Sequence, residues 1–182
     1  MTILIKPVTT ENLDEEMEPC LEDTPAEKRA EFSIHCQSKK AWFKIASDRY
    51  GVCGFMAYLD GGPAGLIEFL PVNAVPYPAE RPKDTMYILC AYVKKDSQKK
   101  GVGRELLSHL IRYLATTPVK CFDGRNTSAV EVYVPCPNPE WPANIQFPAG
   151  GIGFYEKFGF RLKKELPKQE GYLYRLELRH EI

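Results

Sequence analysis

The residues from Gln98 to Arg104, with the sequence QKKGVGR, have the types and spacing of an anion-binding turn. They lie between an apolar run and a segment with helical periodicity. Their backbone N–H groups are therefore expected at the positive end of a helix, where intrahelical partners are missing. Gly101 and Gly103 allow the backbone to approach an anion closely. The alternative is a glycine-rich turn that only shapes a junction between a strand and a helix.

The charge around this turn is strongly basic. Five bases stand against one acid, Asp96, and they are Lys94, Lys95, Lys99, Lys100 and Arg104. A ligand that carries a pyrophosphate is the natural occupant of such a segment. Two common nucleotide-binding loops are excluded, because the chain has no GxxxxGK[ST] motif and because Leu106 interrupts a GxGxxG pattern.

Glu68 is the second group that could do chemistry, because it lies among apolar residues in the segment GLIEFLPV. A carboxylate in such a strand could take a proton from an ammonium substrate, directly or through a water molecule. The alternative is an edge or solvent-facing residue of a strand with alternating polarity.

The elements that must position these groups are strands and helices in mixed order. Hydrophobic periodicity predicts strands over Ile3–Val8, Val52–Leu59, Ala64–Val72, Thr85–Val93, Ala129–Val134, Arg161–Leu166 and Tyr172–Leu178. It predicts helices over Asn12–Leu21, from Thr24 to about Ser47, over Gly101–Leu114 and over Gly153–Phe158. Thr24 is the expected N-cap of the second helix, with Pro25 at its first position. The proline-rich segment Pro135–Pro148 is expected to be irregular. The fold class is one mixed α/β sheet with helices on both faces.

Length and composition indicate a single domain over residues 1–182, with 44% apolar and 26% charged residues. Net charge is zero, which gives no electrostatic reason to expect nucleic acid or an anionic membrane as a partner. Neither a secretory signal nor an apolar run long enough for a membrane span is visible. The six cysteines form no C-x-x-C pair, and no histidine spacing suggests zinc, so we expect no metal. These features favour a cytoplasmic protein with free thiols.

Two of these segments resemble motifs of one known family. The stretch Gln98–Gly103 is similar to the Q/R-x-x-G-x-G/A signature with which GNAT acetyltransferases bind acetyl-CoA. The stretch Gly153–Phe160, with the sequence GFYEKFGF, looks like that family's FYxKxGF segment, which leads from a helix into a strand. The two matches lie about 50 residues apart with one expected strand between them. The resemblance covers roughly Val52–Leu178 and implies a mostly antiparallel sheet.

The resemblance implies an N-acetyltransferase that uses acetyl-CoA as co-substrate. A primary amine would attack the thioester directly, in a ternary complex. The implied cofactor-binding residues are Ala91, Tyr92, Val93, Gln98, Lys99, Lys100, Gly101, Val102, Gly103 and Arg104. The strand that contains the first three would pair with the pantetheine arm, and the N–H groups from Lys99 to Arg104 would hold the pyrophosphate.

The resemblance also implies that Tyr155 protonates the leaving thiolate, a role that suits a phenol because it holds its proton at pH 7. Phe154 and Phe158 are four residues apart and are expected to anchor their helix on the core. Tyr155 is turned by about 100° from Phe154 and is expected to face the cofactor. The alternative is that its hydroxyl only satisfies a buried partner.

The acceptor is expected to be a small-molecule or peptide amine, and the chain could form a homodimer. Cys90, in the strand assigned to the cofactor, is interpreted as a small core residue rather than a nucleophile. A second hypothesis is a non-catalytic module that binds acyl-CoA as a sensor or in an assembly.

Overall fold

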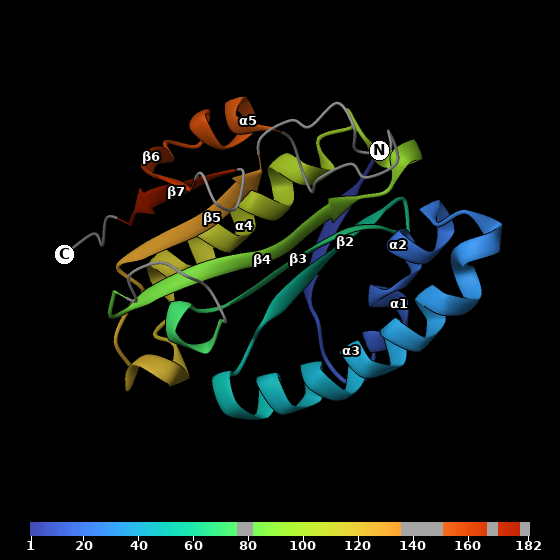
Figure 1. Ribbon diagram of the computed structural model, residues 1–182, viewed down its shortest axis with the longest axis horizontal. Helices are drawn as coiled ribbons and strands as arrows, with labels where there is room; N and C mark the ends of the chain where they lie inside the picture. Colours follow the sequence, from blue (N-terminus) through green and yellow to red (C-terminus); the bar gives the residue numbers. More distant parts are fainter. Residues whose placement is uncertain (76–81, 136–150, 167–170, 179–182) are drawn as a thin grey trace.

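The computed structural model describes residues 1–75, 82–135, 151–166 and 171–178, and these form one seven-stranded sheet (Figure 1). The strand order is β1-β2-β3-β4-β5-β7-β6. The strands are β1 (Ile3–Pro7), β2 (Gly54–Leu59), β3 (Gly62–Pro71), β4 (Thr85–Val93), β5 (Ala129–Pro135), β6 (Arg161–Leu166) and β7 (Gly171–Glu177). Every neighbouring pair is antiparallel except β4 and β5, which are parallel. The predicted mixed, mostly antiparallel sheet is confirmed.

Helices cover both faces of this sheet (Figure 1). One face carries α1 (Leu13–Glu16), α2 (Glu18–Asp23) and α3 (Arg29–Tyr50), and the other carries α4 (Val102–Thr116). A short helix, α5 (Ile152–Glu156), precedes β6. Four 3-10 turns span Ala26–Lys28, Val72–Ala74, Lys95–Ser97 and Lys120–Phe122.

The core on the α4 face follows from the helical stripe in the sequence. Five residues at helical spacing are buried along α4, namely Val102, Leu106, Leu107, Leu110 and Leu114. They pack on the inward residues of the central strands β2, β3 and β4. Burial on both faces explains why β4 is apolar almost throughout.

The core on the opposite face is built around α3. Cys36, Phe43 and Ala46 are the buried residues of this helix, at spacings of seven and three. Lys39 lies between the first two at helical spacing, so it shares their inward face although it is charged. Phe43 and Ala46 pack with residues of β2, β3 and β7.

The N-terminal helices differ from the prediction at two points. The segment Asn12–Leu21 is two helices rather than one, because Pro19 lacks the N–H that a continuous helix would donate to Glu15. The N-cap prediction for Thr24 is wrong. Its hydroxyl instead donates to the Cys20 carbonyl at 2.7 Å and closes α2, and α3 begins only at Arg29.

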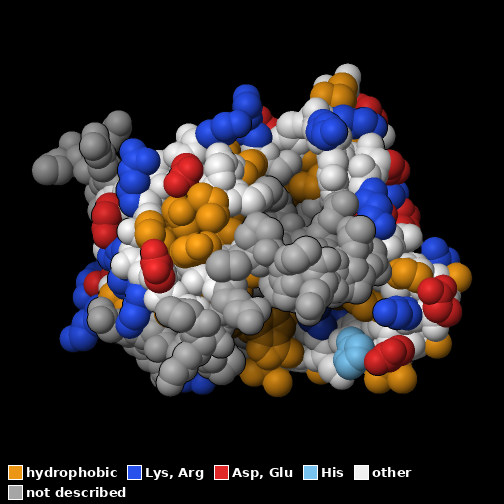
Figure 2. Space-filling model, turned by 45° about the horizontal axis from the view of Figure 1, so that its top comes forward, with side chains coloured by type: hydrophobic (Ala, Val, Ile, Leu, Met, Phe, Trp, Pro, Cys, Tyr) orange, Lys and Arg blue, Asp and Glu red, His pale blue; other side chains and the backbone are white. Residues whose placement is uncertain are grey.

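The surface of the described residues mixes both signs of charge, as zero net charge leads one to expect (Figure 2). Within the same residues, none of the helices combines the length and the apolarity that a membrane span requires. The predicted irregular segment Pro135–Pro148 lies outside the described residues from position 136 onward.

Candidate active site

A β-bulge in β4 lies at the centre of the candidate site. Glu68 of β3 pairs with Cys90, but Phe69 pairs with Ile88, so Leu89 is an extra residue on β4. Simple alternation would place Cys90 on the α4 face together with Ile88. The extra residue reverses this, and Cys90 follows Leu89 on the face that carries Glu68.

Beyond the bulge, β4 and β5 separate. Their parallel pairing runs from Thr85 opposite Ala129 to Ile88 opposite Val132 and includes no described residue after that. The C-terminal half of β4 then pairs only with β3, while β5 continues along β7. One edge of β4 after the bulge therefore has backbone groups that β5 does not bind, and these include the predicted residues Ala91, Tyr92 and Val93.

The predicted anion-binding turn follows directly. Gly101 is the N-cap of α4 with φ +89°, and Lys99 also has a left-handed backbone, with φ +60°. No side chain caps this helix end, and the first intrahelical bond recorded there is from the Glu105 N–H to the Gly101 carbonyl at 3.0 Å. The earlier N–H groups of the helix thus remain available to an anion.

The cations of this turn have unequal surroundings. Lys94 pairs with Glu22 of α2 and lies 3.6 Å from Asp96. Four cations are exposed and have no ion pair with any described residue, namely Lys95, Lys99, Lys100 and Arg104. Positive charge therefore remains next to the free N–H groups of α4, where the phosphates of a ligand would favour it.

Two of the predicted cofactor residues have side chains that act within the protein. Gln98 donates its side-chain amide to the Val93 carbonyl at 3.1 Å and so fixes the turn against β4. Tyr92 points to the α2 face, where its hydroxyl donates to Asp23 at 2.5 Å. Any contact of Tyr92 with a ligand would have to use its backbone.

A small apolar pocket connects the turn to Tyr155. It is lined by Leu66, Ile67, Ala91, Gly103, Leu106, Leu107, Phe154 and Tyr155. A side-chain carbon added to Gly103 would lie 3.5 Å from Val93 and 3.8 Å from Phe154, so at this glycine α4 packs closely on β4 and α5. Gly103 of the predicted turn and Tyr155 therefore line the same pocket.

Tyr155 is more deeply placed than expected. It is 2% exposed. Phe154 and Phe158 are partly buried and pack against the same core, as predicted. The Tyr155 ring packs edge-on against Phe154 and Phe160. Its hydroxyl has no hydrogen bond to another described residue. Burial, and to a smaller extent the nearby Cys90, raise the pKa of Tyr155 well above its usual range.

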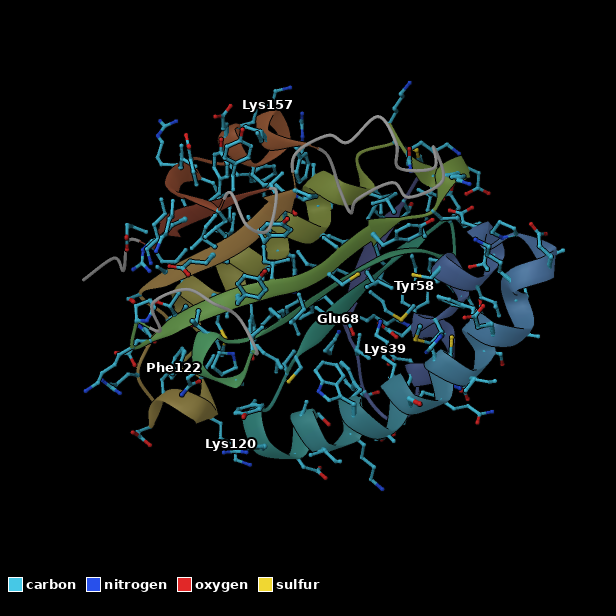
Figure 3. The ribbon with its side chains drawn as sticks, viewed as in Figure 1. Lys39, Tyr58, Glu68, Lys120, Phe122 and Lys157 are labelled. Carbon is cyan, nitrogen blue, oxygen red and sulfur yellow. The ribbon has the colours of Figure 1, made fainter. Side chains whose placement is uncertain are left out.

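Glu68 is buried on the sheet face that α1–α3 cover, where it forms an ion pair. It is therefore neither an edge residue nor a solvent-facing one. Its carboxylate oxygen Oε2 lies 3.0 Å from the ammonium nitrogen of Lys39 (Figure 3). The same ammonium lies 3.1 Å from Oε1 of Glu16. Burial, which is the largest effect, raises the pKa of Glu68, Lys39 lowers it, and Glu16 raises it. Together these effects move the pKa from 4.5 to about 7.

Sequence reasoning missed Lys39 and Glu16. The signal for Lys39 was its position between Cys36 and Phe43 on the inward face of α3, because a lysine there needs a buried acid. Glu16 has the same signal, since it follows the buried Leu13 by one helical turn.

Cys90 connects the two sides of the bulge. It is the strand partner of Glu68, and it contributes to the raised pKa of Tyr155. Burial raises the pKa of the Cys90 thiol far above its usual range, with a further contribution from Glu68. Among the described residues, no group of His, Cys, Asp and Glu side chains could hold a metal ion.

Comparison with known proteins was made by sequence and by structure. Residues 11–134 match the model of the acetyltransferase (GNAT) family. A search of curated proteins found no match. The PaiA N-acetyltransferase of Thermoplasma acidophilum, solved in complex with coenzyme A, superposes with a TM-score of 0.61 at 17% identity, over 97% of this chain and 99% of that one.

Two further solved structures share the fold at low identity. The ribosomal-protein-S18-alanine N-acetyltransferase of Escherichia coli gives a TM-score of 0.56 at 17% identity, over 97% of this chain and 93% of that one. An acetyltransferase of Thermus thermophilus gives 0.61 at 18% identity, over 98% of both chains. Since the family model covers more than half of the sequence, this chain belongs to the GNAT family of acetyltransferases.

Proposed function

We propose that this protein is an N-acetyltransferase that moves the acetyl group of acetyl-CoA to a primary amine by direct attack in a ternary complex. The observation that carries the proposal is the arrangement around the β4 bulge. A buried carboxylate, Glu68, and a buried phenol, Tyr155, lie on its two sides, next to the point where β4 separates from β5.

The residues present fit acetyl-CoA. The free N–H groups at the start of α4 and the exposed lysines of the turn would hold the pyrophosphate. The edge of β4 from Ala91 to Val93 would accept the pantetheine arm, and the pocket beside Gly103 leads from one to the other. When bound there, acetyl-CoA supplies a thioester that is open to a nucleophile.

Glu68 and Tyr155 divide the proton transfers between them. Glu68 takes the proton that the amine must lose as its nitrogen bonds to the acetyl carbon, directly or through water. Tyr155 gives a proton to the sulfur as the carbon–sulfur bond breaks. Because its raised pKa keeps the phenol protonated at neutral pH, Tyr155 enters the reaction with a proton to donate.

A covalent acetyl-cysteine route is disfavoured at this site. Cys90 is the cysteine at the bulge, and its raised pKa keeps the thiol protonated, whereas the thiolate is the nucleophilic form. The protonated state of this thiol favours direct attack of the amine on the thioester.

Initial-velocity kinetics with acetyl-CoA and a panel of amines test this function. The panel should hold small primary amines and peptides with a free N-terminus, with release of free CoA as the signal. Intersecting velocity patterns are expected, as a ternary complex requires. Parallel patterns, or a protein that mass spectrometry shows to be acetylated on Cys90 by acetyl-CoA alone, would contradict direct attack.

The Glu68→Gln variant tests the base. The parent rate is expected to rise as pH increases through about 7, because Glu68 then becomes ionised. The variant should lose this rise. An unchanged pH profile in Glu68→Gln would remove Glu68 from the mechanism.

A further inference from the structure

One ammonium holds two buried carboxylates next to the candidate base. The side chains of Glu16 and Glu68 are 0% and 4% exposed, and Lys39 reaches both of them from α3. Figure 3 shows Lys39 and Glu68 facing one another between α3 and the sheet. We call these three residues the Glu16–Lys39–Glu68 cluster.

This cluster lacks one positive charge. With both carboxylates ionised its net charge is −1, in a place from which water is largely excluded, and such a charge is costly. One oxygen of each carboxylate, Oε2 of Glu16 and Oε1 of Glu68, is buried without a hydrogen-bond donor among the described residues. A single proton shared by the two carboxyl groups would remove the excess charge and satisfy these oxygens.

A second buried carboxylate shows the opposite balance. Glu131 of β5 is 0% exposed and lies 2.7 Å from Lys163 and 2.8 Å from Arg175, so it contacts two cations, of which Arg175 also pairs with the exposed Glu177. Burial of a glutamate in this fold therefore does not by itself create a place for a proton. Among the buried glutamates of the described residues, two share a single cation only in the Glu16–Lys39–Glu68 cluster.

Three thiols also lie around Glu68 among the described residues. Cys90 faces it from β4 and Cys20 lies nearby on α2, with Cys36 of α3 beside Cys20. Burial raises the pKa of each of these thiols, so they stay neutral at physiological pH. The charges that act on Glu68 are therefore those of Lys39 and Glu16.

We propose that Lys39 and Glu16 are positioning residues that set the proton affinity of Glu68, so that the cluster accepts one proton when an acceptor amine is deprotonated. The proposal rests on the proposed function of Glu68 as the base. Lys39 attracts the ionised form and fixes the orientation of its carboxylate. Glu16 repels that form and can accept a hydrogen bond from protonated Glu68.

The two neighbours must therefore act in opposite directions. Replacing Lys39 with Met removes the attraction and should raise the pKa of Glu68, whereas Glu16→Gln removes the repulsion and should lower it. A charge within about 4–6 Å typically shifts a carboxyl pKa by about 1–3 units, so shifts of about one unit or more are expected. A purely structural role of the cluster predicts no such opposition.

The experiment uses two readouts on the full chain. Carbon-13 NMR of the glutamate carboxyl groups, with Glu68→Gln identifying the signal, follows the titration of Glu68 directly. The acidic limb of kcat/KM follows it through activity. In both readouts the pKa of Glu68 should be higher in Lys39→Met and lower in Glu16→Gln than in the parent. Lys39→Arg, which keeps the charge, should restore the parent values.

Lys40→Met is the matched control. Lys40 is the next residue of α3 and pairs with Asp14, whose side chain is 85% exposed, so its loss should leave both readouts unchanged. If Lys39→Met does not fold, Glu16→Gln alone still tests the proposal, because the proposal requires this variant to have a lower pKa of Glu68.

The outcomes separate the two proposals. If the NMR titrations give the same pKa of Glu68 in the parent and both variants, or a shift in the same direction in both variants, the role of Lys39 and Glu16 would be overturned. If the NMR pKa of Glu68 shifts in opposite directions in Lys39→Met and Glu16→Gln while the pH profile of kcat/KM stays fixed, the result would support control of Glu68 by these two residues. That second result would contradict Glu68 as the base.

Discussion

Tyr155 combines deep burial with a hydroxyl that no described residue engages, and this is the state a proton donor needs. Tyr155→Phe keeps the ring contacts with Phe154 and Phe160 and removes only the proton. General acid catalysis contributes about 100- to 10,000-fold, and a loss of about 100-fold in kcat is expected because a thiolate leaves readily. Steady-state kinetics together with acetyl-CoA titration should show the loss of rate at nearly parental affinity.

Tyr174→Phe is the control for this prediction. Tyr174 is also buried, but its hydroxyl is engaged, since it donates to Glu156 of α5 at 3.5 Å. Its variant should turn over like the parent. A Tyr155→Phe enzyme as fast as the parent, with chemistry shown to limit the rate, would leave Tyr155 as a packing residue.

Glu68 should also make folding stability depend on pH. Its pKa is raised in the folded state, so the native protein binds more protons than the unfolded chain between pH 4.5 and about 7. The contribution of Glu68 to stability is therefore fully present below pH 4.5 and is lost as pH rises through about 7. One pKa unit corresponds to about 1.4 kcal/mol, so the loss amounts to roughly 3 kcal/mol at most.

Glu68→Gln removes this dependence, because glutamine resembles the protonated side chain. The free energy of unfolding of the variant should exceed that of the parent at pH 8 but not at pH 4.5, as measured by urea denaturation. Asp14→Asn alters an exposed carboxylate of the same region and should show no comparable change with pH. Equal differences between Glu68→Gln and the parent at both pH values would contradict the raised pKa.

Among the elements, the N-terminal end of α4 has to meet two structural requirements. Its first turn must leave N–H groups free for an anion, and it must lie close enough to β4 and α5 to line the pocket. Gly101 meets the first requirement through a φ of +89°, which residues with a Cβ rarely adopt. Gly103 meets the second by leaving space between Val93 and Phe154.

Gly103→Leu should therefore lose acetyl-CoA binding while the fold remains. The new Cβ meets Val93 and Phe154 at ordinary contact distances, but the rest of the leucine has to enter the pocket. Leucine also favours a helix over glycine, so the melting temperature should not fall much. Calorimetric titration with CoA should show a decrease in affinity of at least about tenfold, or about 1.4 kcal/mol.

Gly103→Ala provides the control, because it adds the Cβ alone. It should bind CoA like the parent and gain a few tenths of a kcal/mol or more from helix propensity. A folded Gly103→Leu protein with parental affinity for CoA would show that the ligand does not pass this turn.

At the scale of the whole molecule, the attraction of the turn for phosphate is local. Net charge is zero, and fields are screened over about 10 Å at 0.1 M salt, so only nearby cations matter. Lys94 is already paired with Glu22, which leaves the exposed cations of the turn to act on a ligand.

The double variant Lys99→Gln and Lys100→Gln should weaken CoA binding most at low ionic strength. Its dissociation constant should also depend less steeply on salt than that of the parent, because fewer screened charges contribute. Lys6→Gln, on the first strand, is the control. Identical salt dependence in the parent and in the double variant would show that backbone N–H groups alone bind the phosphates.

Much of this arrangement was determined by the sequence. Periodicity placed all seven strands, α3 and α4 close to their observed positions. The central strands and α4 bury apolar residues at fixed spacing, whereas β6 is exposed at every residue except Leu166. The turn at Gly101 was also predictable, because glycine permits a left-handed backbone that other residues rarely adopt. The α1–α2 break was predictable too, had Pro19 been given its usual weight.

Only the tertiary structure decided what surrounds the reacting groups. The extra residue Leu89 reverses the side on which Cys90 lies, and a bulge depends on the pairing of two strands rather than on either strand alone. Glu16, Lys39 and Glu68 come from three elements, and their shared buried site exists only when α1 and α3 pack on β3. The proton affinity of Glu68 follows from burial and from these two charges, and neither is a property of its sequence neighbours.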